Sequence, residues 1–167
     1  MKTKLLILFI VSLVTASVNF AYAEISNYPA SNCNWVRGAA ELNFGGIRNN
    51  STSGYLYIEC PAPQRDFSYG VHVGAIEAAW VRVIDHSDTS NIGCLLEAIE
   101  KNSSNGMSFR RSETRYSSGH GDYVQNLVFN AMHLPTYYGH AQVRCWIPPG
   151  ELGHPYSNEV VTYSIQQ

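Results

Sequence analysis

Four cysteines are the residues of this 167-residue chain with the clearest chemistry, and they stand at positions 33, 60, 94 and 145. An even number of cysteines in an exported protein is typical of disulfide bonds. A metal site is the alternative, but no two of these cysteines have the short spacing of zinc ligands. We therefore predict two disulfides. Of the three possible connectivities we expect the sequential one, Cys33–Cys60 and Cys94–Cys145.

Histidines and carboxylates are the next residues that could do chemistry. His86 directly follows Asp85, and His120 precedes Asp122 by two positions, but both pairs lie in loop-like sequence. The chain contains no His-x-His pair and no Gly-x-Ser-x-Gly nucleophile elbow. We therefore expect a non-catalytic protein with no catalytic residues, no metal site and no cofactor. A secreted hydrolase is the alternative, because paired carboxylates are matched in space rather than in sequence.

Aromatic and charged side chains alternate along residues 137–147, so one face of a strand there would carry both. Flat aromatic rings and guanidinium groups on a rigid sheet suit sugar rings or serve as anchors at protein contacts. The alternative is that this face packs against a loop or the margin of a second sheet, since Tyr and Trp favour strands in any case. The candidate binding residues for an unidentified glycan or protein are Tyr138, His140, Arg144 and Trp146.

The elements that must position these residues are short runs rich in Val, Ile, Tyr and Trp, separated by Gly, Pro, Asn and Ser. Two connections, 49–53 and 85–91, have the composition of hairpin turns. The pattern predicts an all-β protein, a single-domain β-sandwich of about seven or eight mostly antiparallel strands with two disulfides. Strands are expected over 40–48, 54–60, 76–85, 92–99, 107–116, 122–130, 137–147 and 158–166.

Alternation within these strands assigns their faces. Cys60 shares an apolar face with Leu56 and Ile58, opposite a face that carries Tyr55 and Tyr57. Cys94 and Cys145 likewise lie in apolar rows of their own strands. Three of the four cysteines are therefore expected on inward faces, as disulfides that cross the core would require.

Residues 1–23 have the three parts of a secretory signal: a start with Lys2 and Lys4, an apolar stretch over 5–14, and a small-x-small site at 21–23. The apolar stretch is short for a membrane span, and an uncleaved anchor is the alternative. Cys33 lies too far along the chain to carry a lipid at the cleavage point. We expect a signal peptide over 1–23 and a secreted domain over 24–167, periplasmic or extracellular, with no stable membrane insertion after cleavage.

The charge of the remaining chain argues against nucleic acid as a partner. Loss of Lys2 and Lys4 leaves nine basic residues against 13 acidic ones, a net charge of −4. Binding to a phosphate backbone requires clustered positive charge. The one basic cluster, Arg110, Arg111 and Arg115, is interrupted by Glu113 and is expected to form a solvated strand face.

The cysteines and the residues beside them also support a resemblance. At Cys33, Cys60-Pro61, Cys94 and Cys145-Trp146-Ile147-Pro148 the chain resembles a loose group of small exported, four-cysteine, β-rich proteins of Gram-negative bacteria. The resemblance supports the fold and adds nothing on mechanism. On the evidence of the exposed aromatic residues, we expect an exported non-catalytic binding module. A subunit of a surface assembly or fibre is a further alternative, in which residues 24–32 or the C-terminal strand would extend a neighbour's sheet.

Overall fold

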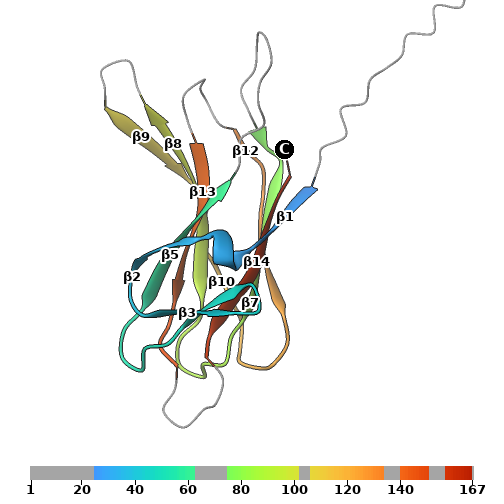
Figure 1. The fold of residues 1–167 in the computed structure, drawn as a ribbon. Helices are drawn as coiled ribbons and strands as arrows, with labels where there is room; N and C mark the ends of the chain where they lie inside the picture. Colours follow the sequence, from blue (N-terminus) through green and yellow to red (C-terminus); the bar gives the residue numbers. More distant parts are fainter. Residues whose placement is uncertain (1–24, 63–74, 102–105, 134–139, 151–156, 167) are drawn as a thin grey trace, which may run out of the picture.

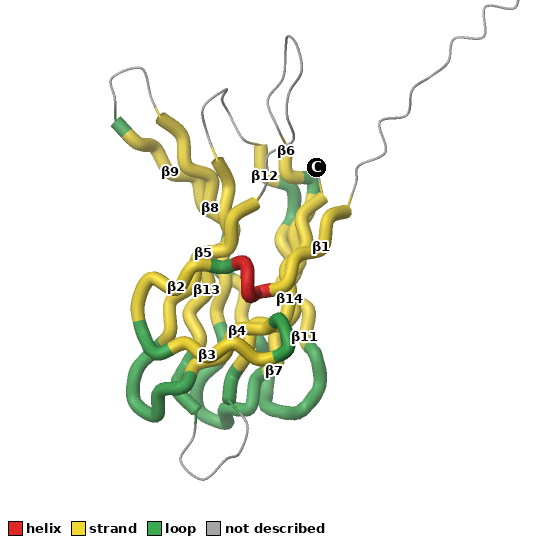
Figure 2. Tube along the Cα trace, in the orientation of Figure 1, coloured by secondary structure: helices red, strands yellow, loops and turns green. Residues whose placement is uncertain are grey.

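The computed structural model describes residues 25–62, 75–101, 106–133, 140–150 and 157–166. They form two antiparallel sheets of six strands each, and the sheets face one another as a β-sandwich (Figures 1 and 2). A further strand pair, β6 (Ala75–Ile76) with β12 (Met132–His133), lies at one end. Among the described residues, no helix is long and apolar enough to cross a membrane. The predicted fold class is confirmed.

The first sheet, called sheet A, has β14 (Glu159–Gln166) in its middle. On one side β14 pairs with β7 (Ala78–Ile84), which pairs with β11 (Gln125–Phe129). On the other side it pairs with β4 (Gly46–Asn49), which pairs with β3 (Ala40–Asn43). Farther along the same side, β14 pairs with β1 (Ile25–Pro29).

The second sheet, called sheet B, has β13 (His140–Ile147) in its middle. On one side β13 pairs with β5 (Leu56–Ala62), which pairs with β2 (Asn34–Arg37). On the other side it pairs with β8 (Gly93–Lys101), whose outer edge is shared by β9 (Met107–Arg111) and β10 (Arg115–Tyr116). The central strands of both sheets are therefore the last two strands that the structure describes.

The core lies between the inner faces of the two sheets, where the predicted apolar rows are found. Leu56, Ile58 and Cys60 of β5 are buried, and so is the row of β13 that includes Val143 and Cys145. Burial of these alternating apolar side chains is the largest favourable contribution to the free energy of folding of a two-layer protein. The alternation that assigned these faces is confirmed.

The sequential disulfide pairing is confirmed, with bonds between Cys33 and Cys60 and between Cys94 and Cys145. The expectation that they cross the core is wrong. Cys94 and Cys145 lie opposite each other on neighbouring strands of sheet B, and their Cα atoms are 4.1 Å apart. Cys33 directly precedes β2, the neighbour of β5, and so it too bonds within sheet B. Both bonds lie on the buried face and tie adjacent strands together.

The expected number of strands is too low, because several predicted runs divide in two. The run 40–48 turns back on itself at Phe44 and Gly45, both with positive φ, and gives β3 and β4. The run 107–116 is interrupted after Arg111 and gives β9 and β10. The two expected hairpins, 49–53 and 85–91, are instead connections from sheet A to sheet B. Turn-forming residues specify a reversal of the chain, and they do not specify which sheet receives the next strand.

The N-terminal segment that the sequence left uncommitted is part of sheet A. All five residues of β1 pair in register with β14. Residues Ala30–Asn32 then form a short 3-10 helix whose Ala30 is buried. This segment therefore completes its own chain's sheet.

Candidate functional site

An aromatic row crosses the outward face of sheet B. The strand register places Tyr57 of β5 beside Trp146 of β13, Trp146 beside Gly93 of β8, and Gly93 beside Tyr116 of β10. Tyr57 and Tyr116 are 40% and 55% exposed. They are three strands apart, which is about 14 Å at the usual strand spacing. The row is therefore long enough for an oligosaccharide or an extended peptide.

Trp146 lies flat in this row because its neighbour has no side chain. A Cβ atom added to Gly93 would lie 2.3 Å from Cε2 and 2.4 Å from Cζ2 and Nε1 of the indole. The ring therefore rests on the backbone of β8. Tyr116 meets it edge to face with the ring centroids 6.0 Å apart, an arrangement that aromatic pairs favour. The result is a half-buried indole held in one orientation, with an exposed tyrosine on each side.

A polar network occupies the strand positions next to this aromatic row. Its centre is Glu97 of β8, whose side chain is 1% exposed. Arg111 Nε donates to Oε1 of Glu97 at 2.6 Å, and Gln142 Nε2 donates to Oε2 at 2.9 Å. Arg144 bridges Glu97 and Glu59, with Nη1 3.3 Å from the first carboxylate and Nε 3.2 Å from the second.

The network keeps Glu97 ionised despite its burial. Burial alone raises the pKa of a carboxyl group, because it penalises the charged form. Here the hydrogen bonds from Arg111 and Gln142 and the charge of Arg144 outweigh burial, so the pKa of Glu97 lies below its usual value. A buried carboxylate with three donors fixes the side chains that surround it. The guanidinium and amide groups beside the aromatic row are therefore preorganised.

A hollow of about 240 Å³ lies between the aromatic row and this network. Its lining includes the indole of Trp146, Arg144 and Arg111, together with Tyr57 and Glu59. Aromatic surface and fixed hydrogen-bonding groups thus meet in one shallow site. Such a site can stack against an apolar ring face and hydrogen-bond to the polar groups at the ring's edge.

The four predicted binding residues have different outcomes. Trp146 and Arg144 lie in the site as predicted. His140 is exposed on the same face of β13, but it is six residues from Trp146, or about 20 Å along the strand. Tyr138 lies outside the described residues. Tyr57, assigned from sequence to a face on another strand, lies beside Trp146 on the same outward face.

Among the residues of the site that the sequence analysis did not propose are Gly93, Glu97 and Tyr116. Each is placed beside Trp146 or Arg144 only by the pairing of β8 with β13 and β10. The alternation of β8 puts Gly93 and Glu97 on the outward face, opposite the apolar row with Cys94. That signal was present in the sequence, but nothing in it identified β13 as the neighbouring strand.

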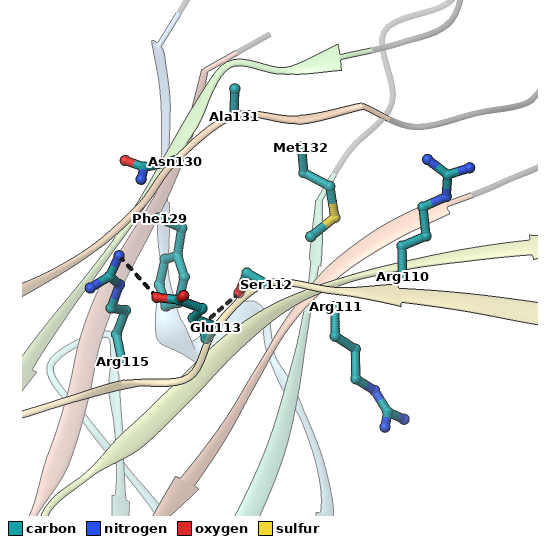
Figure 3. Close-up of a pocket in the computed structure, with 9 residues that line it drawn as sticks. All are labelled: Arg110, Arg111, Ser112, Glu113, Arg115, Phe129, Asn130, Ala131 and Met132. Atoms are coloured by element: carbon teal, nitrogen blue, oxygen red, sulfur yellow. Dashed lines mark hydrogen bonds and ion pairs between the residues drawn. The ribbon is translucent and has the colours of Figure 1, made fainter.

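The predicted basic cluster lines a second hollow, of about 430 Å³, where the edge of sheet B faces β11 and β12 (Figure 3). Figure 3 shows the side chains of Arg110 and Arg111 extending in different directions, while Arg115 turns toward Glu113. The Arg115–Glu113 distance is 3.8 Å. All three arginines are exposed, but they do not share one strand face: Arg110 and Arg111 are consecutive on β9, and Arg115 is on β10. Their charges do not converge on one point.

Neither histidine of the two sequence pairs forms an ion pair with the carboxylate beside it in the sequence. Nδ1 of His86 lies 3.2 Å from Asp122, and His120 pairs with Asp88. These contacts join the loop after β7 to the loop after β10. Within the described part of the chain, no three His, Cys, Asp or Glu side chains are grouped to hold a metal ion.

Buried Asp85 supports the same junction of loops. Its carboxylate accepts hydrogen bonds from the hydroxyl of Ser117 and, at 3.0 Å, from the backbone N–H of Ser87. The Ser117 hydroxyl in turn accepts the N–H of Ile92 at 2.8 Å. The serine is thereby engaged in holding the loops together.

Comparison with known proteins gives a likeness in structure and none in sequence. No protein-family model matches the chain, and no curated protein matches its sequence. Among solved structures, the chain is similar to a low-affinity xylan-binding module of the xylanolytic gut symbiont Roseburia intestinalis. The likeness has 13% sequence identity and a TM-score of 0.44, and it covers 86% of this chain and 96% of that one.

Proposed function

We propose that this protein is an exported, non-catalytic module that binds a glycan chain across the outward face of sheet B. The observation that carries the proposal is the indole of Trp146, lying flat on Gly93 between Tyr57 and Tyr116. The C–H face of a sugar ring is apolar and flat, and it stacks on such a surface with little loss of side-chain freedom, because the indole is already fixed.

The neighbouring network supplies the polar half of the recognition. Arg111 and Arg144 each direct part of their donor groups to Glu97, and their side chains remain 55% and 38% exposed. Guanidinium groups held in this way present their other N–H donors to a ligand at little cost in entropy. The two arginines are matched by Glu97 and Glu59, so their charges are balanced. This balance favours the hydroxyl groups of a neutral glycan over a strongly charged ligand.

The test is retention on a panel of insoluble polysaccharides and immobilised glycans, with the purified oxidised chain. We expect retention of the unmodified protein and its loss in Trp146→Ala, since truncation of a central aromatic anchor typically costs about 2 kcal/mol or more. The matched control is Trp35→Ala. Trp35 is 58% exposed, but it pairs with the inward-facing Ile58 and so lies on the other face of edge strand β2.

Two outcomes would contradict the proposal. One is that the unmodified protein is retained on no member of the panel. The other is that Trp146→Ala, shown by denaturant unfolding to be folded, is retained as well as Trp35→Ala. Loss of retention in both variants would point to a surface other than the aromatic row.

A further inference from the structure

The outward face of sheet A carries a hollow of its own, with a different chemistry. It has a volume of about 530 Å³ and lies over β1, β14, β7 and β11. Trp80 of β7 is the one aromatic side chain in its lining. No residue of this lining belongs to the aromatic row or its network. The two faces of the sandwich therefore present two separate surfaces, each with one tryptophan.

Strand register groups the polar side chains of this hollow around Trp80. Ser164 of β14 lies beside Trp80, and Asn27 of β1 lies beside Ser164. Arg82 is two residues after Trp80 on the same face of β7, and Asn126 of β11 lies beside Arg82. From the rise per residue along a strand, the Cα atoms of Trp80 and Arg82 are about 7 Å apart. That is the scale of one sugar ring with its substituents.

The charge of the hollow distinguishes it from the site on sheet B. Its lining contains the guanidinium of Arg82 and no carboxylate. Arg82 is exposed and forms no ion pair with any described residue. Arg111 and Arg144 on the other face, by contrast, are both paired with buried Glu97. An unpaired guanidinium next to an aromatic ring and two amide groups is suited to an anion attached to a flat, hydroxyl-bearing ring.

We propose that this hollow is a second binding site, which takes a sugar ring that carries a carboxylate. The C–H face of the ring stacks on Trp80, and the carboxylate accepts a bidentate pair of hydrogen bonds from Arg82. The amide NH2 of Asn27, whose oxygen accepts the hydroxyl of Ser164, and the amide of Asn126 hydrogen-bond to the ring hydroxyls. The proposal shares only its ligand class with the proposed function, because none of its residues contributes to the aromatic row. The chain is then bivalent, with a neutral-glycan face and an acidic-sugar face.

The chain has three tryptophans, so binding at each surface can be followed separately. Each indole N–H gives its own signal in a two-dimensional nitrogen–proton NMR spectrum, with Trp80, Trp146 and Trp35 reporting sheet A, sheet B and the edge strand. The probes are the methyl glycosides of glucuronic, galacturonic and N-acetylneuraminic acid, each beside its carboxyl methyl ester. The ester preserves the ring and removes the charge.

We expect at least one acid to shift the Trp80 signal in a saturable way while the Trp146 signal stays in place. The matching ester should bind roughly ten-fold more weakly, because the hydrogen bonds it accepts are no longer charge-assisted. Arg82→Gln should remove the difference between acid and ester, and Arg110→Gln, an exposed arginine of β9, should leave it unchanged. Trp80→Ala removes the reporting indole together with the stacking surface, so binding is read there from the backbone amide signal of Arg82, which neither form should shift.

The proposal is overturned if no acid shifts the Trp80 signal, or if acid and ester bind equally well to the unmodified chain. It is also overturned if Arg82→Gln preserves the discrimination. A shift confined to Trp146 would refute this second site while supporting the first one. Failure of the proposed function would appear instead in the retention assay, as no effect of Trp146→Ala on retention by neutral polysaccharides.

Discussion

Replacing Gly93 by alanine tests whether the aromatic row depends on a missing side chain. The new Cβ would lie 2.3 Å from the nearest indole atom, whereas ordinary contact begins at 3.4 Å, so the ring of Trp146 has to withdraw by about 1 Å. The backbone of Gly93 is not in the left-handed region, so an alanine adds no strain of its own there. Overpacking of this size typically costs about 1–3 kcal/mol. We expect a loss of stability in this range and a loss of glycan retention.

A double-mutant cycle identifies the cause. In a Trp146→Ala background the indole is absent, so Gly93→Ala should be neutral or should stabilise by about 0.4–1 kcal/mol through the unfolded chain. The two substitutions should therefore be coupled by at least about 1 kcal/mol in urea unfolding. Equal costs of Gly93→Ala in the two backgrounds would refute the reasoning, because the clash with the indole would then not be what destabilises the variant.

Two further predictions concern what holds this face together. Because the pKa of Glu97 is depressed in the folded state, its contribution to stability is present above the ordinary carboxyl value of 4.5 and is lost as pH falls through the folded pKa. Urea unfolding between neutral and acidic pH should therefore show a steeper loss of stability for the unmodified chain than for Glu97→Gln, and parallel curves would contradict the network. Removing the Cys94–Cys145 bond with a double alanine variant opens a loop with a sequence separation of 51 residues. The chain-entropy model gives a cost of about 4 kcal/mol for such a loop, against about 3.5 kcal/mol for the Cys33–Cys60 loop. Thermal unfolding of the two double variants should rank them in that order, and the reverse order would show that native packing outweighs loop length.

The layers of the fold and the inward faces of its strands could be predicted, because both depend on short-range pattern. Period-two alternation in β5 and β13 identifies buried rows without knowledge of any partner strand. The same pattern placed Arg144 and Trp146 on an outward face. These are the parts of the site that one strand can specify alone.

Strand order could not be predicted in this way. The loops 49–53 and 85–91 have the composition of hairpin turns, yet each carries the chain to the other sheet. Gly93, Tyr116 and Glu97 became part of the site through pairings between residues distant in the sequence. Local composition predicts which residues form turns and which form strands. The neighbour of each strand depends on the packing of the whole core.

The position of β13 and β14 has a consequence for the order in which the protein folds. Each is the middle strand of its sheet, and together they are the last strands that the structure describes. A chain that lacks residues 140–166 has the outer strands of both sheets, but it lacks the two middle strands that hold each sheet together. The pairing of β13 with β5 and β8 closes long loops in the sequence. Such closures slow folding, because the chain loses conformational entropy before the new contacts compensate for it. The two sheets therefore cannot be completed before residues 140–166 are present, and we expect the preceding strands to remain without a stable core until then.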